Sequence, residues 1–287
     1  METPEELTAE RIEGSLTAAL EAVRERADLA NVYLAACGGS YALMIPLQHI
    51  VESTSTLAAH ALNSREFTTR APKALGPGSV VIVCSHSGDT PETVEAARYG
   101  REQGALTIAL THRLDSPLAE AAEYVIGYQH GDDKRYAYTA APLLYRLVHG
   151  LVDRVEGTST LAEASAATLE LDGLVATLHA EHFQRADAWA KAHSRSSLIY
   201  TMGSGPNYGT AYSFAICLLQ EMMWVHSQGI NGAEYFHGPF EITDYDVPFL
   251  ELLGLGVTRP IDQRAHDFVT TKSDDVLTLD AASWDLS

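Results

Sequence analysis

An apolar strand that leads directly into a hydroxyl-rich turn and a helix start is the feature that most constrains this chain. Residues 79–84 read Ser-Val-Val-Ile-Val-Cys, an apolar run rich in β-branched side chains and without polar alternation. Such a run is typical of a strand buried on both faces, as in a parallel sheet covered by helices. Residues 85–90 form the turn, and Pro91 and Glu92 after it suit the first turn of a helix. The segment therefore predicts a strand–turn–helix unit of an α/β fold.

The same alternation recurs along the chain and predicts two similar lobes. Further strands are expected at residues 31–37, 106–110, 124–128, 197–202, 249–255 and 276–279, and helices at 8–29, 91–104, 139–155, 161–194 and 207–225. The turn Cys37-Gly38-Gly39-Ser40 returns as Met202-Gly203-Ser204-Gly205, a weak internal repeat. We expect an α/β protein of two lobes, each a mostly parallel, doubly wound, flavodoxin-like sheet.

The expected domain organisation follows from the polar segment 156–160, the best candidate linker. Residues 1–29 would form an N-terminal helix, residues 30–157 the first lobe with the phosphate loop, and residues 158–287 the second lobe. The last expected strand is followed by residues 281–287 alone, where a covering helix would normally come. We therefore expect the second lobe to be truncated relative to a complete one.

Charge and cysteine content narrow the classes of partner and compartment. The formal net charge of −19 predicts repulsion of nucleic acids and anionic membranes, so neither is expected as a partner. Cys37, Cys84 and Cys217 have no disulfide-framework spacing and are expected as reduced thiols. The acidic start does not resemble a signal peptide, and no uncharged apolar run is long enough to span a membrane. These features predict a cytoplasmic protein.

The turn after the strand at 79–84 has the chemistry of a phosphate site. Ser85, Ser87 and Thr90 supply hydroxyls, Gly88 allows close approach of the backbone, and a helix begins behind them. Ser and Thr before a helix also act as caps, which would explain a single hydroxyl.

Two neighbouring features bear on the same turn. Gly39 and Ser40 follow the first strand and should lie at the same sheet edge. His86 could donate to the ligand or face solvent. His179 and His182 have no evident third ligand, and no dinucleotide or Walker motif occurs, so no metal or cofactor is expected.

A single carboxylate in an apolar helix is the second candidate site. Glu221 is the only charged residue between Tyr208 and Val225, which predicts a buried helix and a carboxylate with a raised pKa, suited to acid–base chemistry. A structural Glu paired with a backbone group or an Arg is the alternative. Residues 229–239 are rich in Gly and aromatic side chains, and His237 within them could be a proton shuttle or a structural residue.

Residues 85–93, Ser-His-Ser-Gly-Asp-Thr-Pro-Glu-Thr, resemble the Ser-x-Ser-Gly-x-Thr-x-[Glu/Asp]-Thr signature of sugar isomerase (SIS) domains. The resemblance covers about residues 25–280 and implies two SIS lobes. It implies that Ser85, Ser87 and Thr90, with Ser40 beside them, hold a sugar 6-phosphate.

The helical Glu and the loop ending in His-Gly-Pro resemble those of glucosamine-6-phosphate synthase and the fructosamine-6-phosphate deglycases. The resemblance implies that Glu221 moves protons at C1 and C2 of the sugar. It implies that His237 acts in ring opening or as a general acid, contributed by the neighbouring subunit of a homodimer. Glu234 matches another acidic position of that loop. The synthase carries Glu and Lys on the preceding helix, where this chain has Phe214 and Leu218.

Three functions remain open on the sequence. The favoured one is a deglycase that cleaves a fructosamine 6-phosphate into glucose 6-phosphate and an amine. The second is an aldose–ketose or amino-sugar phosphate isomerase, and the third a non-catalytic sugar-phosphate sensor. A sensor needs no acid–base pair, so Glu221 with His237 favours an enzyme.

Overall fold

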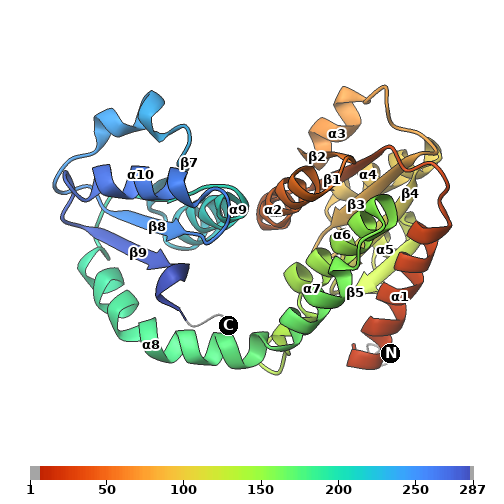
Figure 1. Ribbon diagram of the computed structural model, residues 1–287, viewed down its shortest axis with the longest axis horizontal. Helices are drawn as coiled ribbons and strands as arrows, with labels where there is room; N and C mark the ends of the chain where they lie inside the picture. The colour runs from red at the N-terminus through yellow and green to blue at the C-terminus, as the bar shows by residue number, and fades with distance from the viewer. Residues whose placement is uncertain (1–6, 285–287) are drawn as a thin grey trace. The chain divides into compact units, whose positions relative to one another are not determined.

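The structure, a computed structural model, describes residues 7–284 and divides the chain into two compact units (Figure 1). The first unit ends at Gly173 and the second begins at Leu174. This division comes later than the expected boundary at 157/158, because helix α7 (Thr160–Leu169) packs against helix α6 (Ala140–Glu156) of the first unit.

The first unit contains a five-stranded parallel sheet. Its strands are β1 (Asn31–Ala36), β2 (Ala58–Asn63), β3 (Ser79–Cys84), β4 (Leu106–Thr111) and β5 (Tyr124–Gly127). They lie in the order β2-β1-β3-β4-β5, with Val32 of β1 opposite Val80 of β3. The chain reverses its direction of winding between β1 and β3, which makes this the switch point of a doubly wound sheet. The prediction of an α/β fold with a parallel sheet is confirmed.

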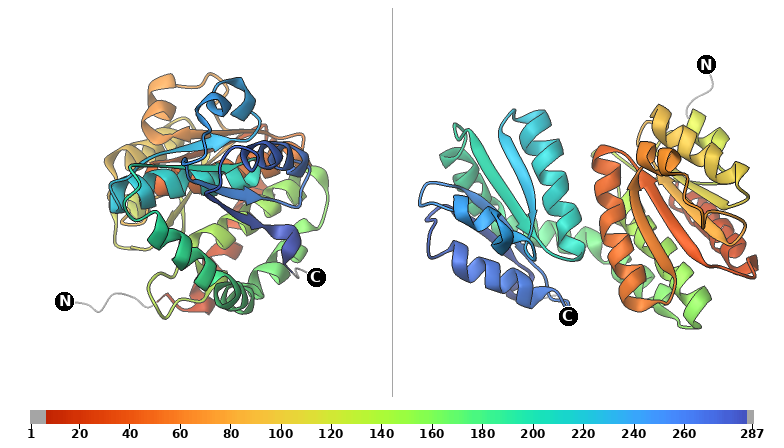
Figure 2. Two further views of the ribbon diagram at one scale, coloured as in Figure 1. Left: turned by 90° about the vertical axis from the view of Figure 1, so that its left-hand side faces the viewer. Right: turned by 90° about the horizontal axis from the view of Figure 1, so that it is seen from above.

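Helices cover both faces of this sheet, as the second view of Figure 2 illustrates. The remaining elements are α1 (Ala9–Glu25), α2 (Gly38–Thr54), α3 (Ser64–Arg70), α4 (Pro91–Glu102), α5 (Pro117–Ala121) and the short 3-10 helix η1 (Tyr136–Tyr138). Along β3, Ile82 belongs to the core cluster of α1, α2 and α6, whereas Val81 and Val83 belong to that of α3, α4 and α5. This two-sided burial explains why β3 reads as a continuous apolar run.

The second unit contains a four-stranded parallel sheet. Its strands are β6 (Leu198–Gly203), β7 (His226–Asn231), β8 (Phe249–Leu253) and β9 (Val276–Asp280), in the order β7-β6-β8-β9. The order matches that of the first four strands of the first unit. The other elements are α8 (Leu171–Ala192), α9 (Pro206–Ser213), the π-helix η2 (Phe214–Met222), α10 (Arg259–Val269) and the 3-10 helices η3 (Tyr235–His237), η4 (Pro239–Ile242) and η5 (Ala281–Ser283).

The structure corrects several expected elements. Gly38–Ser40 form the first turn of α2 rather than a separate loop, and the stretch 161–194 is two helices that break at Glu170. The expected helix 207–225 ends at Met222 and is a π-helix over its second half. Within residues 7–284, no helix is both long and apolar enough to cross a membrane.

Candidate functional site

A cavity of about 450 Å³ opens at the carboxyl end of β1 and β3, where the sheet of the first unit changes winding direction. Open α/β sheets bind their ligands at this kind of position. The cavity is lined by Cys37, Gly39, Ser40, Leu43, Cys84, Ser85, His86, Ser87, Thr90 and Thr93. The structure thus brings together six of the residues expected to hold the substrate: Gly39, Ser40, Ser85, His86, Ser87 and Thr90.

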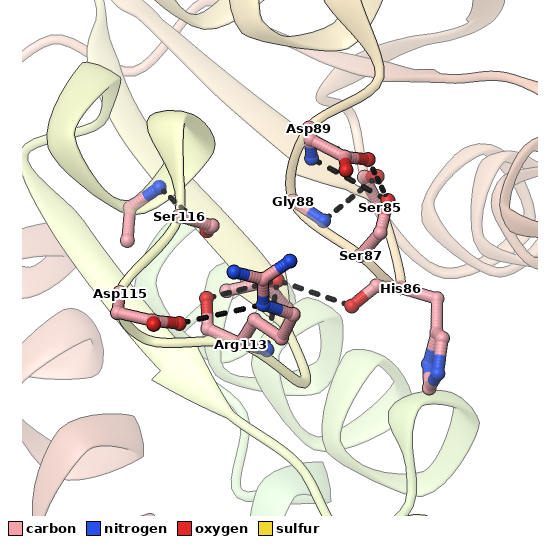
Figure 3. A network of polar contacts seen from close by, with 10 residues as sticks. Ser85, His86, Ser87, Gly88, Asp89, Arg113, Asp115 and Ser116 are labelled. Carbon is pink, nitrogen blue, oxygen red and sulfur yellow. Dashed lines mark hydrogen bonds and ion pairs between the residues drawn. The ribbon is translucent and has the colours of Figure 1, made fainter. Parts of the chain in front are cut away.

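The hydroxyls of the turn are not used as helix caps. Thr90 is the N-cap residue of α4, yet its side chain makes no capping hydrogen bond. Its Oγ1 lies 2.8 Å from the Oγ of Ser85 and faces the cavity with it. The Ser87 hydroxyl donates to the carboxylate of Asp89 (Figure 3). The arrangement therefore disfavours the capping explanation for Thr90 and leaves its hydroxyl beside the cavity.

Gly88 holds the turn against the loop that follows β4. Its N–H donates to Ser85 Oγ at 3.2 Å, and its carbonyl accepts from the N–H of Leu118 at 2.9 Å. It has φ +69°, and a Cβ here would lie 2.1 Å from the Oγ of Ser116. Figure 3 shows Ser116 facing this part of the turn. Gly88 is not one of the cavity-lining residues, so its expected contact with substrate stays a prediction.

The cavity wall includes a buried thiol beside the Ser40 hydroxyl. Burial raises the pKa of the Cys84 thiol to about 12, and the hydrogen bond with Ser40 opposes this shift in part. The thiol therefore stays protonated at neutral pH and contributes a neutral wall. Cys37, Cys84 and Cys217 are all free thiols, as expected from their spacing.

Two helices begin at the cavity without side-chain caps. The N-cap residue of α2 is Cys37 and that of α4 is Thr90, and neither side chain bonds to the first helical N–H groups. Free N–H groups and the positive end of the helix dipole favour an anion at such a position. The ten lining residues include no Lys and no Arg. An anion in this cavity would depend on backbone N–H groups, hydroxyls and the imidazole of His86.

His86 belongs to a cluster of aromatic side chains that the sequence analysis did not identify. Its ring stacks on that of His112, with centroids 5.1 Å apart, and meets the ring of His130 edge-on at 4.5 Å. Its Nδ1 lies 3.0 Å from the hydroxyl of Tyr128. The three partners follow β4 and β5, so the rule that ligands gather at the carboxyl ends of strands could have pointed to them.

Glu221 does not have the environment that the sequence predicted. It lies near the end of η2, where only Ala215 and Leu219 are buried, and its own side chain is exposed in the single chain. The expectation of a buried carboxylate is therefore wrong for this chain on its own. The physical reason is that the apolar residues around Glu221 are not all covered: Leu218 and Met222 of η2 and the following Met223 are exposed.

His237 and Glu234 also lie on the surface of the second unit. His237 ends η3 and Glu234 precedes it, and both side chains are exposed. The N–H of His237 donates to the carbonyl of Glu234 at 2.9 Å. Across residues 7–284, no hydrogen bond or ion pair joins Glu221 to His237. Their catalytic roles stay predictions.

Metal binding is not indicated by the described part of the chain. Residues 7–284 contain no group of three or more His, Cys, Asp or Glu side chains placed to hold a metal ion.

Comparison with known proteins identifies the family. The sequence profile of the SIS domain matches residues 27–147, which contain the cavity and its loop. Fructosamine deglycase FrlB of Bacillus subtilis is 44% identical over 258 residues, which cover 90% of this chain and 79% of that protein. Fructoselysine 6-phosphate deglycase of Escherichia coli is 31% identical over 255 residues, with 89% and 74% covered.

The fold agrees with the sequence match. A crystal structure from Bacillus subtilis, described as that of a phosphosugar isomerase, superposes with a TM-score of 0.93 at 42% identity, over 96% of this chain and 84% of that one. The resemblance drawn from the loop at residues 85–93 is confirmed. With a profile match over the cavity and a relative that is 44% identical over 90% of this chain, this chain belongs to the SIS domain family.

Proposed function

We propose that this protein is a deglycase that cleaves a fructosamine 6-phosphate into glucose 6-phosphate and a free amine. The observation that carries the proposal is the hydroxyl-lined cavity at the switch point, in a chain that is 44% identical to a fructosamine deglycase. The cavity suits the phosphate because uncapped N–H groups of α2 and α4 meet the hydroxyls of Ser85 and Thr90 there. Because sugar phosphates are metabolites of the cell interior, the proposed activity is cytoplasmic.

The second unit is proposed to be a second SIS lobe. Its sheet order β7-β6-β8-β9 repeats the order β2-β1-β3-β4 of the first unit, and both sheets are parallel. The strand–turn–helix at Gly203-Ser204-Gly205 occupies the same topological place as that at Cys37–Ser40. These matches support an internal duplication.

The proposed chemistry moves one proton and then hydrolyses an imine. The open-chain substrate has a ketone at C2 and a secondary amine on C1. Glu221 removes a proton from C1 while O2 takes up a proton from water, which gives an enaminol. It then returns its proton to C2, and the nitrogen lone pair forms the C=N bond of the protonated aldimine. Water adds to C1, and the C–N bond breaks as His237 donates a proton to the departing amine. Positioned acid–base groups of this kind contribute about 10²–10⁴ in rate each.

The exposure of both catalytic candidates is compatible with a site completed by a second subunit. Trp224, 89% exposed, follows η2 and adds to the apolar surface of Leu218, Met222 and Met223 around Glu221. Covering this surface in a homodimer would remove water from around the Glu221 carboxyl and place it in an apolar site suited to acid–base chemistry. We therefore propose a homodimer with shared active sites.

The reaction is tested by incubating the protein with fructoselysine 6-phosphate and measuring glucose 6-phosphate and lysine. Glu221→Gln should lower the rate by about 10²–10⁴ while 6-phosphate binding is retained. Glu241→Gln, an exposed carboxylate in η4, is the matched control. Interconversion of fructose 6-phosphate and glucose 6-phosphate without release of amine would contradict the deglycase and favour an isomerase. Tight binding with no turnover of any substrate would favour a sensor.

Shared sites are tested by subunit mixing. Glu221→Gln and His237→Ala chains, each inactive, are combined under conditions that allow subunit exchange. A mixed dimer would contain one site with both native groups, so part of the activity should return. If exchange is demonstrated by mass-tagged subunits and the mixture stays inactive, the shared-site proposal is wrong.

A further inference from the structure

The cluster of His86, His112 and His130 lies beside the phosphate cavity, and its chemistry is not used by the proposed reaction. His86 lines the cavity and stacks on His112 with only 3° between the ring planes. His130 lies edge-on to both other rings, at 4.5 Å and 5.9 Å between centroids. Three imidazoles in mutual contact repel one another when charged, so the cluster favours neutral rings.

Hydrogen bonds define the donors around His86. The Nδ1 of His112 lies 3.0 Å from the backbone carbonyl of Tyr128, which only accepts, so His112 carries a proton on Nδ1. The phenol of Tyr128 lies 3.0 Å from Nδ1 of His86. Burial raises the pKa of this phenol, which therefore stays protonated. A phenol both donates and accepts, so it can serve the neutral ring or the protonated ring of His86 by rotation of its O–H.

No anion within the described part of the chain neutralises the cluster. The titratable groups that face His86 are His112 after β4, and Tyr128 and His130 around the end of β5. The Cys84 thiol that ends β3 acts on Tyr128. None of the three imidazoles forms a hydrogen bond or ion pair with a carboxylate of residues 7–284. The nearby Asp89 carboxylate accepts from Ser87 instead. The cavity therefore offers a place for an anion next to an imidazole that has no counter-ion.

We propose that His86 is a substrate-binding residue whose imidazole takes up a proton when a phosphate dianion fills the cavity, and that His112 and His130 keep it neutral until then. The inference rests on the proposed phosphate site and adds a charged form of His86 to the bound state. The ligand class is a dianionic phosphate monoester. No Lys or Arg lines the cavity, so the protonated imidazole of His86 would supply the positive charge there when the phosphate binds. The chain as a whole has a net charge of −19.

The direction of the proton linkage follows from the surroundings of the ring. In the free protein, partial desolvation lowers the pKa of His86, and the neighbouring His130 and His112 lower it further. A dianion in contact with the ring favours the charged form and raises the pKa of His86 above its value in the free protein. Binding is therefore strongest below the free pKa and weakens as pH rises through the pKa of the complex. Between the two values the dissociation constant should rise about tenfold per pH unit.

The test is calorimetric binding of sorbitol 6-phosphate, an unreactive open-chain ester, from pH 6.5 to 8.5. The ester titrates near pH 6 and is mostly a dianion over this range. Each pH is repeated in buffers of different ionisation enthalpy, so that the slope of observed enthalpy gives the protons taken up per site. We expect the wild-type protein to take up as much as about one proton, with affinity falling as pH rises.

Three variants separate the roles. His86→Gln keeps a hydrogen-bond donor but cannot titrate, so proton uptake and the pH dependence of affinity should vanish while weaker binding remains. His130→Gln removes an imidazole that lowers the pKa of His86, so His86 should be more protonated before binding. Uptake should then fall and the affinity profile should move to higher pH. His60→Gln, on β2 and stacked on Tyr33, is the matched control and should behave as wild type.

The outcomes distinguish this inference from the proposed function. Equal proton uptake by wild type and His86→Gln, with both folded by circular dichroism, would overturn the role of His86 and leave the phosphate site intact. Binding without any linked proton would do the same. If wild type did not bind sorbitol 6-phosphate at any pH, the phosphate site would be refuted, and this inference with it. An unchanged pH profile in His130→Gln would refute the role given to His130.

Discussion

Replacing Gly88 by Ala tests how the phosphate turn is held in place. The new Cβ would lie 2.1 Å from the Oγ and 2.4 Å from the Cβ of Ser116, and 2.8 Å from the Oγ1 of Thr111. Ser116 is 1% exposed and Thr111 fully buried, so neither can move into solvent. The residue would also keep φ +69°, which costs about 1–2 kcal/mol for a side chain, and the overlap adds about 1–3 kcal/mol. We expect a loss of about 2–5 kcal/mol in the free energy of unfolding.

The matched control is Gly157→Ala, which ends α6. Gly157 has the same φ of +69°, but a Cβ there would meet nothing within 4 Å. Its substitution should cost only the backbone term, about 1–2 kcal/mol. Stability is measured by urea denaturation and binding by calorimetry with sorbitol 6-phosphate. Gly88→Ala should also weaken binding, because it displaces the N–H that donates to Ser85 Oγ. Equal destabilisation by the two variants, with binding unchanged in both, would refute the packing role of Gly88.

Two further predictions concern a hydroxyl and a partly buried ion pair. Thr90→Val should weaken 6-phosphate binding about 10–100-fold with α4 intact, because hydrogen bonds to charged groups contribute about 1.5–3 kcal/mol and Thr90 makes no side-chain cap. Calorimetry measures the affinity of both variants. The control is Thr54→Val, because the Thr54 hydroxyl bonds only to the carbonyl of Ile50. Equal affinity of the Thr90 and Thr54 variants would contradict the role of the Thr90 hydroxyl. The Nδ1 of His266 lies 2.6 Å from the carboxylate of Glu251, and this hydrogen bond raises the pKa of His266. The pair should therefore stabilise the folded state fully below the unfolded pKa of His, about 6.5. This stabilisation should be lost as pH rises through the pKa of His266 in the folded state. Melting temperatures from pH 5.5 to 9 should show this fall in wild type and lose it in His266→Gln; an identical fall in both would show that another group causes it.

The strands that could be predicted most directly from the sequence were those in which every residue is buried. β3 and β4 are buried along their whole length, so their sequences are uninterrupted apolar runs. β2 and β7 were not predicted, and both are edge strands of their sheets. β7 reads His-Ser-Gln-Gly-Ile-Asn and buries only Ile230 fully, so its sequence does not differ from that of a loop. β5 and β9 are edge strands too, but they contain apolar residues such as Ile126 and Leu277 and were predicted. The missed strands therefore lacked the hydrophobic pattern itself, which edge position permits but does not require.

The site was predictable where its residues are adjacent in the chain. Ser85, Ser87 and Thr90 follow one strand within six positions, and their hydroxyls share one cavity with Ser40. The histidine cluster was not predicted, because His86 and His130 come from different strand ends and meet only once the sheet is formed. The burial of Glu221 was predicted wrongly because an apolar sequence indicates that a surface should be covered. It does not indicate whether the cover comes from the same chain.

The two units have the same strand order but different charges at the carboxyl edge of the sheet, and this difference bears on how many phosphates one chain can hold. In the second unit, the loop after β8 takes the place of the Ser85–Thr90 turn. There the carboxylate of Asp262, in the first turn of α10, accepts from the N–H of Gly254 at 3.3 Å and lies beside Ser204. Asp262 is buried, which raises the pKa of its carboxyl, and a carboxylate already occupies the backbone donor that an anion would need. The first unit has hydroxyls and no carboxylate lining the equivalent cavity. A phosphate should therefore bind to the first unit and be excluded from the second, because the Asp262 carboxylate repels it and already accepts from the N–H of Gly254.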